Sequence, residues 1–194
     1  MATTAVFAEI LIVGLEVEAW ILVAVLAVSG TDWIDTGDAA DFAGLVLVVV
    51  LALAYVLGIL VDRLADTFID WVEDRDRGKS IKKRLMKHPE FEKPADVAPM
   101  RMMVMHESEG MTRFLDYQRS RWRITRATIV NLAVLGVAGA LYLGLQVAWY
   151  WLFVPLAGAL VLIAITYFAG VRIQEAWVER LSDAYGIVSD TSKA

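Results

Sequence analysis

Long apolar stretches alternate with polar ones along this chain, and the four longest have the length of membrane spans. A bilayer has a hydrocarbon core about 30 Å thick, so a helix that rises about 1.5 Å per residue needs about 20 apolar residues to cross it. The predicted spans cover about 7–29, 42–62, 127–147 and 150–171. We therefore expect an all-α, polytopic membrane protein with four transmembrane helices in two hairpins.

The helical pattern continues beyond the second span. Apolar residues from Leu57 to Val72 recur at i, i+3 and i+4, and acidic residues spaced by four occupy another face. Arginines precede the third span at matching intervals, so the two helices, set antiparallel, would form a ladder of ion pairs. The predicted pairs are Asp62–Arg126, Asp66–Arg123 and Asp70–Arg119. The alternative is a solvated set of charges in which each exposed pair stabilises by less than about 1 kcal/mol.

These patterns divide the chain into four regions. Helices 2 and 3 extend from the membrane as a cytoplasmic stalk, and a C-terminal amphipathic helix follows the last span. The predicted regions are a transmembrane hairpin (1–62), the stalk and its turn (63–126), a second hairpin (127–171) and the C-terminal helix and tail (172–194).

Basic residues predict the orientation of the spans. Of 18 Lys and Arg, 15 lie between Arg63 and Arg126, and the two opposite loops contain none. The positive-inside rule therefore places this tract and both termini in the cytoplasm, most simply at the plasma (inner) membrane of a prokaryote. The first opposite loop is acidic, which could concentrate cations at an outer mouth or could serve solubility alone. Its charged residues are Asp32, Asp35, Asp38 and Asp41.

Composition narrows the function classes. The chain is 58% hydrophobic and has no cysteine, which excludes disulfide scaffolds and thiolate chemistry. A net charge of −5 argues against a nucleic-acid partner. No catalytic constellation, cofactor motif or metal-ligand cluster stands out, so we expect neither an enzyme nor a bound cofactor or metal.

Candidate chemistry lies in the first span, where three carboxylates interrupt the apolar sequence. Glu9 and Glu16 are about 700° apart on a helix and share a face, whereas Glu18 lies about 200° from Glu16. Acids inside a span are functional candidates as proton carriers or cation ligands, or else they are polar groups that hold helices together. Predicted neutral partners are Tyr55, Asn131, Thr166 and Tyr167.

Small residues recur every four positions on the third span, at Gly136, Ala140 and Gly144. This spacing permits close helix contact, either within the chain or between copies.

Together these features predict a homo-oligomeric membrane pore or channel for cations or protons, with Glu16, Glu18 and Glu9 near the path. The main alternative is a non-conducting scaffold or sensor whose stalk docks a soluble cytoplasmic protein, as in a signalling or defence system. A third hypothesis is that the protein is a small transporter. The expected partners are the lipid bilayer, further copies of the chain and, for the alternative, that soluble protein.

Overall fold

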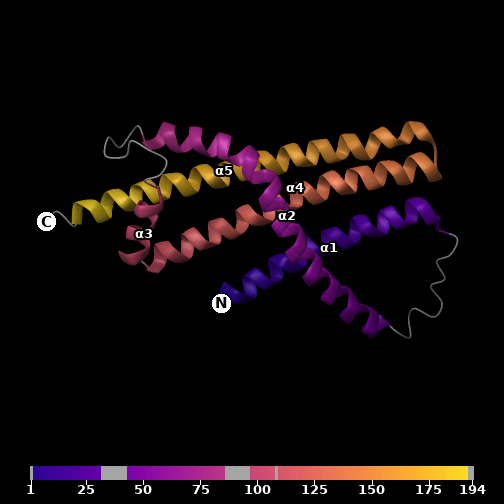
Figure 1. The fold of residues 1–194 in the computed structure, drawn as a ribbon, viewed down its shortest axis with the longest axis horizontal. Coiled ribbons are helices and arrows are strands. Elements are labelled where there is room, and N and C mark those ends of the chain that lie inside the picture. The colour runs from indigo at the N-terminus through magenta and orange to yellow at the C-terminus, as the bar shows by residue number, and fades with distance from the viewer. Residues whose placement is uncertain (1, 32–42, 86–96, 108, 192–194) are drawn as a thin grey trace. The chain divides into compact units, whose positions relative to one another are not determined.

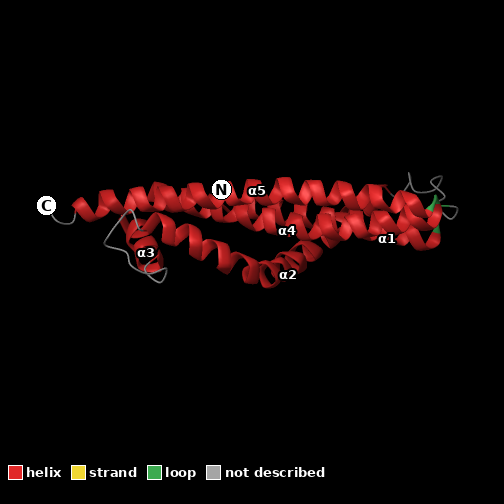
Figure 2. Cartoon of the chain, turned by 90° about the horizontal axis from the view of Figure 1, so that it is seen from above, coloured by secondary structure: helices red, strands yellow, loops and turns green. Residues whose placement is uncertain are grey.

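The computed structural model describes residues 2–31, 43–85, 97–107 and 109–191. Every regular element in these ranges is a helix, and none is a strand (Figure 2). The elements are α1 (Ala2–Ser29), α2 (Ala43–Leu85), α3 (Val97–Glu107), α4 (Glu109–Gln146), the short 3-10 helix η3 (Trp149–Leu152) and α5 (Phe153–Thr191) (Figure 1). The all-α prediction is confirmed.

Four helices are long and apolar enough to cross a membrane, as predicted. The candidate segments are Val6–Ser29, Ala43–Thr67, Gly110–Gln146 and Trp149–Tyr185. With 43, 38 and 39 residues, α2, α4 and α5 each exceed the number needed to cross a bilayer. Each of these three helices therefore continues well past its own most apolar stretch.

The chain divides into two compact units. Unit 1 contains Met1–Asp66 and Ile124–Phe168, and unit 2 contains Thr67–Arg123 and Ala169–Ala194. Unit 1 thus holds α1 and the apolar parts of α2, α4 and α5, and unit 2 holds the polar continuations of these three helices together with α3.

In unit 1, α1 and α2 cross at two glycines. A Cβ atom on Gly14 would overlap the backbone of Ala54, and one on Gly58 would overlap the carbonyl oxygen of Ile10. Small residues let helix backbones approach this closely, and Ala54 is fully buried at the crossing. The N-terminal part of α2 leaves this contact, since Ala43–Val49 and 51–53 are all exposed.

The core of unit 1 joins α1, α2 and α4. Its buried residues are small or β-branched, which allows three helices to approach one another. They are Val13, Val17, Val61, Ala65 and Ala127, with Trp20, Leu57 and Val130 packed around them.

Helix α5 packs against α4 in unit 1. A Cβ atom on Gly136 would crowd the side chain of Ala159, and one on Gly144 would lie 3.7 Å from Cβ of Leu152. Ala140, between these glycines, is 8% exposed. Gly136 of α4 therefore faces α5, and Gly144 faces η3, which connects α4 to α5.

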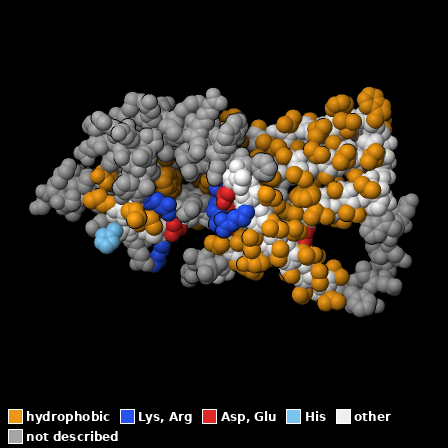
Figure 3. Space-filling view, in the orientation of Figure 1, with side chains coloured by type: hydrophobic (Ala, Val, Ile, Leu, Met, Phe, Trp, Pro, Cys, Tyr) orange, Lys and Arg blue, Asp and Glu red, His pale blue; other side chains and the backbone are white. Residues whose placement is uncertain are grey.

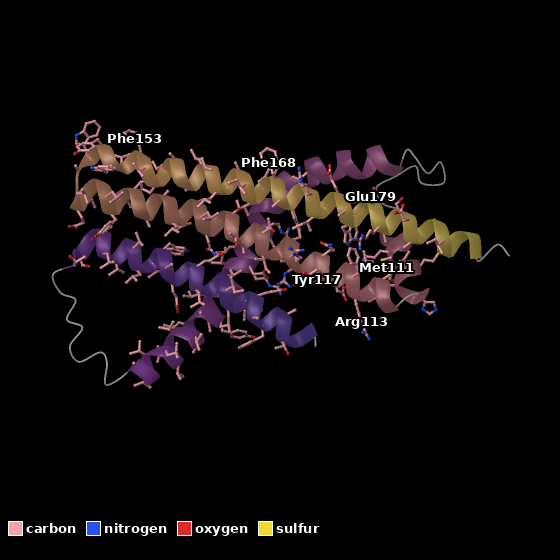
Figure 4. All side chains as sticks on the ribbon, turned by 180° about the vertical axis from the view of Figure 1, so that it is seen from behind. Met111, Arg113, Tyr117, Phe153, Phe168 and Glu179 are labelled. Carbon is pink, nitrogen blue, oxygen red and sulfur yellow. The ribbon has the colours of Figure 1, made fainter. Side chains whose placement is uncertain are left out.

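The outer surface of unit 1 is apolar. Hydrophobic side chains cover much of the visible surface of the apolar helices (Figure 3). Phe153 and Phe168 project from α5 on the side away from α4, and they are 60% and 67% exposed (Figure 4). An apolar surface of this extent is suited to lipid or to other apolar helices rather than to water.

Unit 2 has a separate core built from α3, α4 and α5. Val104, Leu115 and Leu181 are almost completely buried in it, and Ala184 lies beside them. The guanidinium of Arg180 lies 4.4 Å from the ring centroid of Phe114, within the range of a cation–π contact.

The helix crossing yields a stability prediction. Gly14→Ala places a methyl group against the α2 backbone, so we expect the free energy of unfolding to fall by about 1–3 kcal/mol. Unfolding in detergent micelles followed by circular dichroism measures this change. Gly158→Ala on α5 is the matched control, because a Cβ atom there meets nothing within 4 Å. Equal stability of the two variants would contradict the crossing.

Candidate functional site

Glu16 on α1 is held by two hydrogen-bond donors on α4. The Thr128 hydroxyl lies 3.0 Å from Oε1 and 3.2 Å from Oε2 of Glu16, and Asn131 Nδ2 donates to Oε2 at 2.9 Å. Both donors lie on one face of α4, because residues three apart are neighbours on a helix surface. The carboxyl of Glu16 is therefore anchored in the α1–α4 interface, where both of its oxygens accept hydrogen bonds.

Asn131 is the centre of this polar cluster. Its side chain is buried, with the residue only 3% exposed. Besides Glu16, its Nδ2 reaches the carbonyl oxygen of Val13 at 3.2 Å, and its Oδ1 accepts a hydrogen bond from Trp20 Nε1 at 3.3 Å. A buried amide with both its oxygen and its nitrogen engaged is well matched to an apolar interface, where unpaired polar groups are costly.

These contacts also fix the level of Glu16 along the bundle. Helices α1 and α4 run parallel, and a second contact between them joins Gln146 Nε2 to the carbonyl oxygen of Ala27 at 2.9 Å. By these two contacts Arg126 is level with about residues 7–11 of α1, so Glu16 lies roughly 8–14 Å further along the axis. Glu9 lies near the level of Arg126.

A charged pair lies at that level, between α2 and α4. Arg126 Nη2 donates to Asp66 Oδ1, and the arginine residue is only 9% exposed. In the predicted ladder Arg126 was paired with Asp62 and Asp66 with Arg123. Asp62 is buried as well, at 8% exposed, while the side chains of Asp70 and Arg119 lie outside the described residues.

Glu18 has a different environment from Glu16. It is half-buried, and its Oε1 is a buried atom with no hydrogen-bond partner among the described residues. It lies about 160° around α1 from Glu16 and about 40° from Gly14, which contacts α2. Glu18 therefore faces the α2 side of α1, away from the donors on α4.

The other predicted neutral partners lie elsewhere. Of the four, Asn131 alone donates to Glu16 among the described residues. The ring of Tyr55 lies 5.2 Å from that of Phe7, and the ring of Tyr167 lies 6.0 Å from that of Phe168. Thr166 is half-buried on α5.

The remaining predicted features give little further chemistry. The acidic loop residues Asp32, Asp35, Asp38 and Asp41 lie outside the described residues. Among the described residues, no group of three or more His, Asp or Glu side chains could hold a metal ion. The candidate site is therefore the pair of carboxyls on α1 and the donors around Glu16.

Two residues of the cluster were not among the predicted site residues. Thr128 is three positions before Asn131 on α4, and Trp20 is four positions after Glu16 on α1. That i, i+3 and i, i+4 spacing is the signal that could have found them. Thr and Trp side chains also occur in apolar helices without such a role. The spacing therefore identifies Thr128 and Trp20 only once the faces of α1 and α4 that contact each other are known.

Comparisons with models of protein families, with curated proteins and with solved structures found no match to this chain.

The Thr128–Glu16 contact predicts a coupled loss of stability. Thr128→Val removes the hydroxyl and preserves the side-chain shape, so we expect the free energy of unfolding to fall by about 0.6–1.7 kcal/mol, the range for hydrogen bonds between membrane helices. In a Glu16→Leu background the same substitution should have almost no effect. Unfolding in micelles measures all four proteins of this cycle, and an equal loss in both backgrounds would show that the two residues do not interact.

The charged pair predicts rescue by reversal. Asp66→Arg places a second guanidinium beside the buried one of Arg126, so we expect a loss of about 2 kcal/mol or more in the free energy of unfolding. Arg126→Asp in the same chain should recover most of that loss. Thermal unfolding of the two single variants and the double variant checks this, and a double variant no more stable than either single one would argue against the pair.

Proposed function

We propose that this chain is the subunit of a homo-oligomeric integral membrane pore or channel that conducts cations or protons, with α1 beside the path. The observation that supports this most directly is the placing of two carboxyls in an apolar helix, one anchored by α4 and one with a buried oxygen that accepts no hydrogen bond from the described residues. Acids inside membrane spans commonly mark ion or proton pathways.

The proposed topology puts both termini in the cytoplasm and forms two transmembrane hairpins. The distribution of Lys and Arg supports this orientation. In the same topology the polar continuations of α2 and α4 extend from the inner surface as a stalk. The exposed aromatic residues of η3 would then lie at the outer interface, where Trp and Tyr are favoured.

Assembly from several copies is proposed because the chain buries little of its own apolar surface. None of the residues in the most apolar window of α5 is buried, and only 17% of those in the corresponding window of α2 are buried. Four spans alone also enclose little room for a water-filled path. Several copies placed around an axis would provide that path and would bring α1 of each copy near it.

A non-conducting scaffold or sensor is the second candidate. Unit 2 supports it, because this unit has its own core and still exposes large apolar side chains. Met102 is 74% exposed, Tyr117 55% and Ile187 71%. Under this hypothesis a soluble cytoplasmic protein docks on unit 2, and unit 1 serves as the membrane anchor.

Ion flux tests the proposal. Full-length protein reconstituted in liposomes should conduct protons or monovalent cations, and the double variant Glu16→Gln, Glu18→Gln should lose about tenfold or more of that flux. A tenfold loss corresponds to about 1.4 kcal/mol in the barrier. Glu175→Gln, an exposed carboxyl outside unit 1, is the matched control and should conduct like the wild type.

Two results would contradict the pore. One is flux that is unchanged in the double variant, and the other is a strictly monomeric protein by native mass spectrometry of the detergent complex. Stoichiometric co-purification of a soluble protein that depends on residues 63–126, without flux, would favour the scaffold.

A further inference from the structure

Glu18 differs from Glu16 in lacking hydrogen-bond donors. Its Oε1 is buried and has no hydrogen-bond partner in the described parts of the chain, whereas both oxygens of Glu16 accept hydrogen bonds. Thr128 and Asn131 already serve Glu16, on the opposite side of α1. They are therefore not placed to serve Glu18.

The helices packed against α1 offer no nearby positive charge for Glu18. On α2, Tyr55 is the one titratable side chain between Ala43 and Val61. It comes after Ala54, the residue that contacts Gly14, so it lies on the side of the crossing toward Ile10 and away from Glu18. On α4, Tyr142 is the one titratable side chain between 127 and 146. Arg126, just before that stretch, donates to Asp66, and Glu16 and Glu9 on α1 itself are acidic.

An ionised carboxylate oxygen buried without a donor is strongly unfavourable in apolar surroundings. A positive species on the carboxyl removes that cost, and the described residues near Glu18 supply none. We propose that Glu18 is the cation-binding carboxyl of this protein and that its ligand is an exchangeable monovalent cation, a proton or a sodium ion.

The two carboxyls then have different roles. Glu16 is a positioning residue that holds α1 against α4 through Thr128 and Asn131. Glu18 binds and releases the cation on the α2 side of α1, near the glycine crossing. This inference rests on the proposed function, because the bound cation is taken to be the one that the pore conducts. Cation binding at Glu18 can nevertheless be measured without measuring flux.

Labelling with dicyclohexylcarbodiimide tests the site. This apolar reagent reacts with a protonated carboxyl in an apolar environment. The acid proton moves to one carbodiimide nitrogen, the carboxyl oxygen bonds to the central carbon, and the acyl group then migrates from oxygen to nitrogen to give a stable N-acylurea. No oxidant or other reactant is needed. Full-length protein in lipid nanodiscs is labelled in sodium-free buffer, and the adduct is located by peptide mass spectrometry.

We expect one adduct per chain, at Glu18, and a lower labelling rate as the pH is raised. Glu18→Gln should lose the adduct, and Glu175→Gln should keep it. Sodium chloride, compared with choline chloride at equal ionic strength, separates the two cations. Protection by sodium identifies a sodium site, and labelling that responds to pH but not to sodium identifies a proton site.

Labelling at Glu16 as fast as at Glu18, or no adduct at Glu18 in folded wild-type protein, would overturn the proposal. Because the wild type itself is mapped, this result does not depend on the folding of Glu18→Gln. A labelled Glu18 in a protein that conducts nothing would support the site and reject the pore, whereas flux without labelling would reject the site alone.

Discussion

The arrangement of the apolar helices depends on one constraint, which is that the carboxyls of α1 lie in an apolar helix and need polar partners or bound cations there. Glu16 meets it with hydrogen bonds from Thr128 and Asn131. These bonds set both the rotation and the level of α1 against α4, because a shift of one residue would turn the carboxyl by about 100°. The hydrogen bond from the half-buried indole of Trp20 to the buried amide of Asn131 then follows from the same register.

Close contacts at glycines complete the arrangement, on the α2 side of α1 and between α4 and α5. Gly14 and Gly58 allow α2 to cross at backbone contact, and Gly136 allows α5 to lie close to α4. Such contacts contribute through dispersion and through close approach rather than through the burial of apolar area from water, since lipid tails are as apolar as the helices. The hydrogen bonds of Glu16 and the contact of Gly14 thus act on different faces of α1, the former toward α4 and the latter toward α2.

Length and periodicity were sufficient to predict an all-α chain with four apolar helices, because crossing a bilayer sets a minimum length that few soluble helices satisfy. Asn131, which donates to Glu16, was one of four candidate partners predicted for the acids of the first span, since few polar side chains occur in the other spans. The hydrogen bond from Thr128 to Glu16 and the α1–α2 crossing at Gly14 were not predicted. Both depend on the rotation of one helix against another, which a single helical pattern does not contain.

A structure of the full-length protein in lipid nanodiscs, determined by electron cryomicroscopy, tests the central claim most directly. The claim is that protein contacts, not lipid, surround the α1 carboxyls within the membrane. We predict that α1 crosses the bilayer with Glu16 within hydrogen-bond distance of Thr128 and Asn131, and that Phe153 and Phe168 lie toward lipid or a neighbouring copy. A Glu16 side chain directed into the acyl chains, or an α1 helix that lies outside the bilayer, would contradict the account.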